Sequence, residues 1–202
     1  MPASELSSEI HKTRPVSIVG KARSRVRLVE IINNPEAAKL ISDPMRRAIL
    51  NLLRLRSHTQ AELAESLGLT DASMNYHLQL LKRARFITIV KREEEGHGIM
   101  QKFYAPTAYL YLPDVEVLPR EVARYFYPIN IERARGVLSV LGNPQQIAGP
   151  NGREVDKLGE DLAKALVKVA RRYTEKEVSQ HEGEVLVEEI YAKALSELRR
   201  PK

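Results

Sequence analysis

A short polar segment of this 202-residue sequence concentrates side chains that form hydrogen bonds in fixed patterns. They lie between residues 73 and 83 and are Ser73, Asn75, Tyr76, Gln79, Lys82 and Arg83. Asparagine and glutamine amides can pair with adenine, serine adapts to several bases, and tyrosine can reach a phosphate or a thymine methyl group. The segment therefore predicts noncovalent readout of a nucleic-acid duplex.

The apolar residues of the same segment predict the helix that would position these side chains. Met74, Leu78 and Leu81 recur at a helical spacing, so one stripe faces a core and the polar set faces outward. Thr70 is the expected N-cap of this helix. A preceding helix is predicted by the capping box from Thr59 to Glu62 and ends at a glycine, residue 68. Only Leu69 lies between the glycine that ends the first helix and the N-cap of the second, which indicates a very tight turn.

Further elements are expected on both sides of this pair. Pro35 can open a short helix, and Asp43 with Pro44 predicts the N-cap and first residue of another, whose apolar stripe begins at Met45. After the outward-facing helix, residues 86–92 and 99–105 read as two strands because β-branched and aromatic residues dominate them. Residues 93–98 contain two glycines and predict the turn between them. Residues 109–112 predict one more short extended piece.

Helix, tight turn, helix and hairpin in this order predict a winged helix-turn-helix. The second helix of such a unit lies in the major groove, where base edges present distinguishable patterns. The hairpin carries the cations Lys91, Arg92 and Lys102, which can reach the phosphate backbone. Its expected tip, residues 93–95, is acidic and would be repelled by phosphates.

The excess of positive over negative charge is confined to the first half of the chain. Residues 1–105 hold 17 Lys and Arg against 11 Asp and Glu, whereas residues 106–202 hold 15 of each. Residues 1–28 read as a basic arm closed by a short strand, and Arg23, Arg25 and Arg27 are its candidate DNA contacts. A solvated tail is the alternative interpretation of the arm. An anionic membrane surface is a weaker candidate partner, because no amphipathic basic helix accompanies the charge.

Several classes of protein are excluded or disfavoured. The sequence has no cysteine, which excludes disulfides and thiolate metal sites. It has no apolar run of about 18 residues and no signal-like start, so we expect a cytoplasmic protein without a membrane partner. No phosphate-binding loop, dinucleotide fingerprint or nucleophile elbow occurs, so we expect no enzyme and no cofactor.

The second half is predicted to be helical. Residues 119–140 indicate a helix interrupted at Pro128, residues 143–152 a loop, and residues 153–173 and 187–198 two amphipathic helices. These two stripes could cover each other or a second copy of the chain. We therefore expect a fold that is mainly α with a small β-hairpin wing. Its expected parts are an arm (1–28), a winged helix-turn-helix (29–112) and a helical dimerisation or effector domain (113–202).

Residues from about 41 to 107, one third of the chain, resemble winged-helix transcriptional regulators of the arsenic-repressor (ArsR) type. The similar stretches are DPMRRAILNLL (43–53), QAELAESLGLT (60–70), SMNYHLQLL (73–81) and QKFY (101–104). The overall layout is similar to archaeal members of unknown effector. The resemblance implies a homodimer that binds double-stranded DNA, usually as a repressor.

The sequence departs from this family at two points. Its members usually carry a glycine just before the first hairpin strand, where this chain has Arg85 and Phe86. Their metal-sensing residues do not carry over, because the thiolate ligands are missing and only His181, with Glu177 and Glu184, could supply ligands in the last helices.

These observations favour a sequence-specific DNA-binding regulator, with a small-molecule effector of unknown identity as a further possible partner. The alternative is a winged-helix module that docks other proteins of the transcription machinery. RNA binding is a third interpretation, but the sequence offers few aromatic stacking platforms beyond Phe103 and Tyr104.

Overall fold

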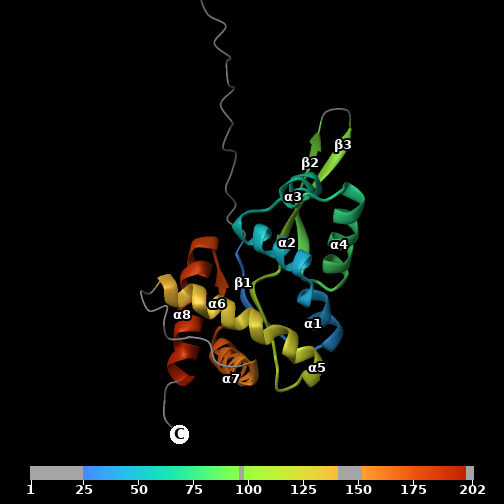
Figure 1. Ribbon diagram of the computed structural model, residues 1–202. Helices are drawn as coiled ribbons and strands as arrows, with labels where there is room; N and C mark the ends of the chain where they lie inside the picture. Colours follow the sequence, from blue (N-terminus) through green and yellow to red (C-terminus); the bar gives the residue numbers. More distant parts are fainter. Residues whose placement is uncertain (1–24, 96–97, 141–151, 199–202) are drawn as a thin grey trace, which may run out of the picture.

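The computed structural model describes residues 25–95, 98–140 and 152–198. A group of four helices and a long hairpin form one end of the molecule, and the remaining helices form the other (Figure 1). A small sheet lies between the two groups. The fold class expected from the sequence, mainly α with a small hairpin wing, is confirmed.

Four short helices follow the first strand, and each begins at an N-cap side chain. They are α1 (Pro35–Ser42), α2 (Pro44–Leu55), α3 (Gln60–Leu67) and α4 (Asp71–Arg83). Asp43 caps α2 by accepting a hydrogen bond from the Arg46 amide, and Thr59 with Glu62 forms the predicted capping box of α3. Thr70 caps α4 by accepting from the Ser73 amide. The predicted starts of α1 to α4 are thus confirmed.

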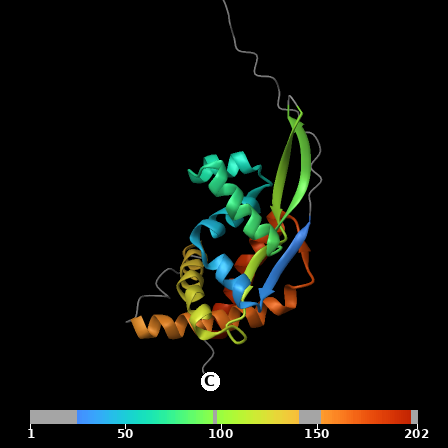
Figure 2. The ribbon, with the colours of Figure 1, turned by 90° about the vertical axis from the view of Figure 1, so that its right-hand side faces the viewer.

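The hairpin is longer than the sequence predicted. β2 (Ile87–Glu95) pairs antiparallel with β3 (Ile99–Pro106), and the hairpin projects away from the helices (Figure 2). The expected turn over residues 93–98 is therefore wrong in extent, because Glu93, Glu94 and Glu95 continue β2 opposite residues 99–101. Cross-strand pairing outweighs the low strand propensity of three consecutive glutamates.

A three-stranded sheet joins segments that are far apart in the sequence. Its order is β4-β1-β5, with β1 (Val26–Ile32) central, β4 (Ala108–Pro113) parallel to it and β5 (Glu177–Val178) antiparallel to it. The short strand that the sequence predicted at the end of the arm is confirmed as β1. The two-residue β5 was not predicted.

The rest of the chain is helical, as expected. Its elements are α5 (Arg120–Ala123), a 3₁₀ turn (Arg124–Phe126), α6 (Tyr127–Val140), α7 (Gly152–Ala170), a second 3₁₀ turn (Arg171–Tyr173) and α8 (Gln180–Leu198). The predicted interruption at Pro128 is wrong by a few residues. The break is the 3₁₀ turn before it, because proline is tolerated in the first turn of a helix and Pro128 is the second residue of α6.

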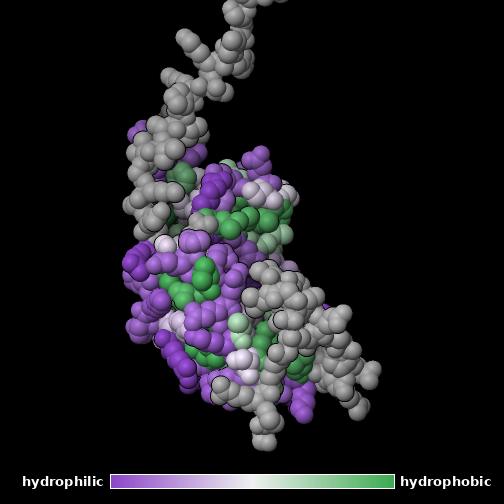
Figure 3. Space-filling model, turned by 90° about the vertical axis from the view of Figure 1, so that its left-hand side faces the viewer, coloured by the Kyte–Doolittle hydropathy of each residue, from purple (hydrophilic) through white to green (hydrophobic). Residues whose placement is uncertain are grey.

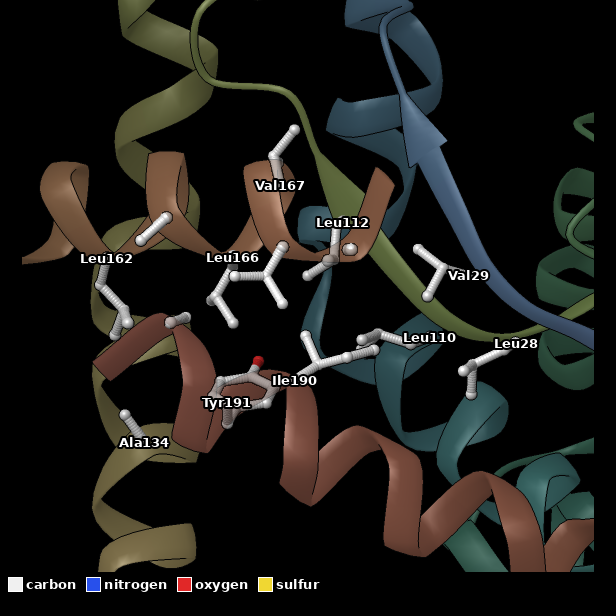
Figure 4. Packing of buried hydrophobic residues seen from close by; sticks show 14 of the residues in the cluster. Leu28, Val29, Leu110, Leu112, Ala134, Leu162, Leu166, Val167, Ile190 and Tyr191 are labelled. Atoms are coloured by element: carbon white, nitrogen blue, oxygen red, sulfur yellow. The ribbon is translucent and has the colours of Figure 1, made fainter. Parts of the chain in front are cut away.

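The two largest hydrophobic clusters fill the two ends of the molecule. One lies among α1 to α4, the base of the hairpin and α5. The other packs β1 and β4 against α6, α7 and α8, with Leu166 of α7 and Ile190 and Tyr191 of α8 at its centre (Figure 4). The apolar stripes of α7 and α8 thus cover each other within one chain. No helix in the described part of the chain is long and apolar enough to span a bilayer.

Candidate nucleic-acid interface

Helix α4 is held so that one face is buried and the opposite face is open. Met74, Leu78 and Leu81 are fully buried in the cluster among α1 to α4, as the sequence predicted. The turn before α4 is very short because Gly68 adopts a left-handed conformation with φ of 63°, and the Leu69 amide then donates to the carbonyl of Ala64. This pair of helices with its tight turn has the geometry of a groove-reading unit.

The polar side chains of α4 are exposed on the outward face as the sequence predicted, except that Ser73 is half-buried. Tyr76, with 61% of its surface exposed, Gln79 and Arg83 follow one another along the centre of the open face. Asn75 and Lys82 are exposed on one flank. Ser73 is half-buried on the other flank, beside the cap of the helix. The face therefore offers amides, hydroxyls and cations together, which suits base edges in its centre and phosphates at its rim.

The turn that follows α4 contains a residue in the left-handed conformation that is not a glycine. Arg85 has φ of 60°, the one positive φ among the described non-glycine residues. Its amide donates to the carbonyl of Lys82, and the Phe86 amide donates to the carbonyl of Leu81, which is a Schellman motif. An arginine thus takes the conformation that glycine favours, and the hairpin leaves the helix in a fixed direction.

The cations of the hairpin differ in how they are engaged. Lys91 forms an ion pair with Glu93 and lies 5.3 Å from the centroid of the Phe103 ring. Arg92 and Lys102 face each other across the two strands as an exposed pair of like charges. Like charges directly opposite each other destabilise a hairpin, and an anion bound between them would relieve the repulsion. Arg92 and Lys102 are therefore better placed than Lys91 for a phosphate.

Comparison with known proteins agrees with this geometry. Residues 41–90 match a family model described as a helix-turn-helix domain. The chain carries a helix-turn-helix domain. Over 50 residues it is 42% identical to the transcriptional repressor SdpR of Bacillus subtilis (strain 168), a match that covers 25% of this chain and 56% of that protein. The chain thus spans little more than half the length of the curated relative that it matches.

The cations expected in the arm lie at the three-stranded sheet or outside the described part of the chain. Arg23 lies outside the described residues. Arg25 precedes β1 and donates a 2.9 Å hydrogen bond to the carbonyl oxygen of Glu177, while Arg27 in β1 pairs with Glu30 at 2.6 Å. Both described arginines are exposed, and both have a partner within the protein.

The histidines give no sign of metal binding in the part of the chain that is described. Glu177 lies in β5 and not on the helix of His181, so its expected place in the last helices is wrong. Glu184 is engaged with Tyr109 and Arg54. No three metal-ligating side chains gather among the described residues. His77 of α4 is half-buried, with its ring edge against Tyr76.

Sequence reasoning missed two polar junctions beside the helix-turn-helix domain. At the first, the guanidinium of Arg54 in α2 lies 4.7 Å from the Tyr109 ring centroid and 3.3 Å from a carboxylate oxygen of Glu184, and Tyr109 donates a hydrogen bond to that oxygen. At the second, the Tyr111 hydroxyl bonds to the turn after α4. Both involve β4, and no local pattern could have indicated partners so distant in the sequence.

Proposed function

We propose that this protein is a sequence-specific, double-stranded DNA-binding transcription regulator that acts in the cytoplasm. The observation that carries the proposal is the open polar face of α4, with Tyr76 and Gln79 at its centre and Arg83 at its end. The helix-turn-helix match and the similarity to a repressor support the same function. In this account α4 enters the major groove and the proposed base contacts are Asn75, Tyr76 and Gln79.

The remaining candidate residues are proposed to bind the phosphate backbone. Lys91, Arg92 and Lys102 on the hairpin, with Lys82 and Ser73 on the flanks of α4, would meet phosphates beside the groove. Arg23, Arg25 and Arg27 would add contacts beyond the domain. Phosphate contacts fix the register of the protein and make its affinity sensitive to salt, whereas base contacts set the preferred sequence.

We further propose that the protein binds as a homodimer and represses transcription, with the helical segment 113–202 supplying the dimer surface. One recognition helix reads only a few base pairs, and a two-fold dimer doubles the site. Figure 3 shows the face on the α8 side as mostly hydrophilic with separate hydrophobic patches, and Val185 of α8 is 54% exposed. The stripes of α7 and α8 do not themselves require a second chain, because they pack on each other.

Binding-site selection from random duplexes tests the proposal. The expected result is a pseudo-palindromic motif with half-sites about one helical turn apart, bound by two chains. Sedimentation at micromolar concentration should show a dimer. Absence of any duplex affinity at low salt would instead favour a protein-docking module, and a monomer that binds one chain per site would overturn the dimer.

A further inference from the structure

A cavity lies where α2 of the helix-turn-helix domain meets β4 and α6. Its empty space, including the part open to solvent, is about 490 Å³. Leu50 of α2, Leu110 of β4, Phe126 and Ile129 provide apolar walls. A ligand that fills the cavity would therefore bury an apolar body between the two ends of the molecule.

Positive charge dominates the lining of this cavity. Arg47 and Arg54 lie two turns apart on the same face of α2, and Arg133 comes from α6 on the other side. No aspartate or glutamate of the described segments lines the cavity. Burial, and after it the nearby charge of Arg133, lowers the pKa of Arg47. The cavity thus brings guanidinium groups together at a cost that a bound anion would offset.

One guanidinium group of the lining is incompletely paired among the described residues, close to two further polar side chains. Asn130 lines the cavity and is only 5% exposed. No described aspartate or glutamate shares the lining with Arg133. The Nε atom of Arg54 is buried without an acceptor, although the other end of that guanidinium meets Glu184. Buried polar groups without partners are costly, so these atoms mark a place for acceptor oxygens of a ligand.

We propose that this cavity binds a small organic acid, with its carboxylate held by Arg133 and Asn130 and its apolar body held by Leu50, Phe126 and Ile129. The planar guanidinium fork matches a carboxylate through two parallel hydrogen bonds. The apolar walls distinguish such an acid from inorganic phosphate, which has no apolar body to bury. The neutral analogue of the acid would leave the guanidinium groups uncompensated.

Occupation of the cavity also changes duplex affinity, a step that rests on the proposed function. Tyr111 lines the cavity, and its hydroxyl donates a 2.6 Å hydrogen bond to the carbonyl oxygen of Phe86 in the turn after α4. Arg54 lines the cavity from the helix-turn-helix domain and meets Glu184 of α8. A ligand in the cavity therefore contacts residues that hold α4 and the helical half in place.

The test is calorimetric titration of the full chain without DNA. The probes are benzoate, phenylacetate, hexanoate and succinate, with benzyl alcohol, hexanol and inorganic phosphate as comparison compounds, each up to about 10 mM so that even a millimolar dissociation constant is detected. At least one monocarboxylate with an apolar body should bind, and its alcohol and phosphate should bind at least tenfold more weakly. Arg133→Gln should weaken the binding of that acid at least tenfold.

Arg135→Gln is the matched control, because Arg135 lies on the same helix, pairs with Glu132 and does not line the cavity. It should change the affinity less than twofold. Thermal unfolding checks that both variants fold. The proposal is overturned if no acid binds, if alcohols or phosphate bind as tightly as the acids, or if Arg133→Gln binds as the original protein does. Duplex titration with and without the bound acid tests the coupling separately, and an unchanged affinity overturns that step alone.

Discussion

The hydroxyl of Tyr111 donates a 2.6 Å hydrogen bond to the carbonyl oxygen of Phe86, in the turn that joins α4 to the hairpin. The same hydroxyl accepts hydrogen bonds from the backbone amides of Thr107 and Ala108 at 3.1 and 3.0 Å. One side chain of the central sheet thus fixes both the exit of the recognition helix and the end of the hairpin. The direction of α4 depends on β4 through this contact.

Tyr111→Phe removes this hydroxyl while keeping the ring. We expect the free energy of unfolding to fall by about 1–3 kcal/mol, because the Phe86 carbonyl and the amides of Thr107 and Ala108 each lose one hydrogen bond. Urea denaturation measures the change. Tyr125→Phe is the control, because Tyr125 is 60% exposed, and its effect should be close to zero. Equal effects of the two substitutions would contradict the role assigned to Tyr111.

Two left-handed residues end α3 and α4, and one of them is not a glycine. Replacing Arg85 with glycine should raise the free energy of unfolding by about 1 kcal/mol. The left-handed conformation is unfavourable for a residue with a β-carbon, and glycine has none. Gly68→Ala should lower the free energy of unfolding by a similar amount. A β-carbon at Gly68 would meet nothing within 4 Å, so the cost is that of the backbone alone. Thermal unfolding that shows the same sign for both variants would contradict this account.

The ionisation of Tyr109 makes stability depend on pH in the alkaline range. Burial, and after it the hydrogen bond to Glu184, raises the pKa of Tyr109 to about 12, whereas an unfolded tyrosine has a pKa of about 10. The folded state therefore holds this proton more tightly. The stabilisation is complete below about pH 10 and is lost as pH rises from about 10 through 12.

Tyr109→Phe lacks this group and should lose less stability between about pH 9 and pH 11 than the original protein does. Urea denaturation at the two pH values measures both losses, and the other tyrosines are common to the two proteins. An equally steep decline in Tyr109→Phe would show that Tyr109 titrates normally in the folded state.

The local features of the helix-turn-helix could be predicted because their signals are contiguous in the sequence. Thr59 with Glu62, the glycine at 68 and the N-cap Thr70 each act within one turn of helix, and the structure confirms them. The outward face of α4 followed from the spacing of Met74, Leu78 and Leu81, and its proposed contacts with DNA stay predictions. The spacing of apolar residues is sufficient to predict the exposed face of a helix when the helix packs against the protein on one side only.

Features that depend on distant partners could not be predicted. β5 has only two residues and exists because it pairs with β1, some 150 residues earlier in the chain. The contact between Tyr111 and Phe86 and the cluster of Arg54, Tyr109 and Glu184 likewise bring distant segments together. Neither has a signature in the local sequence. The cavity between α2, β4 and α6 therefore could not be predicted from the sequence.

Removing residues 1–24 should weaken binding to all duplexes by a similar factor and flatten the salt dependence. Residues 10–29 hold six cations and no anion, and each cation that meets a phosphate adds about 0.9 to the log–log slope. Affinities of the intact and shortened proteins between about 50 and 200 mM salt give the two slopes. Equal slopes would show that the arm does not contact the duplex.

The most direct test of the central claim is the base preference of Gln79→Ala on the selected duplex and on its single-base variants, measured by fluorescence anisotropy. We expect a loss of about 1–3 kcal/mol on the preferred duplex and a relaxed preference at one position of each half-site. Asn33→Ala is the matched control, because Asn33 is an exposed amide outside α4, and it should change neither quantity. If Gln79→Ala keeps both the affinity and the base preference of the original protein, and Tyr76→Ala does the same, α4 does not read the duplex.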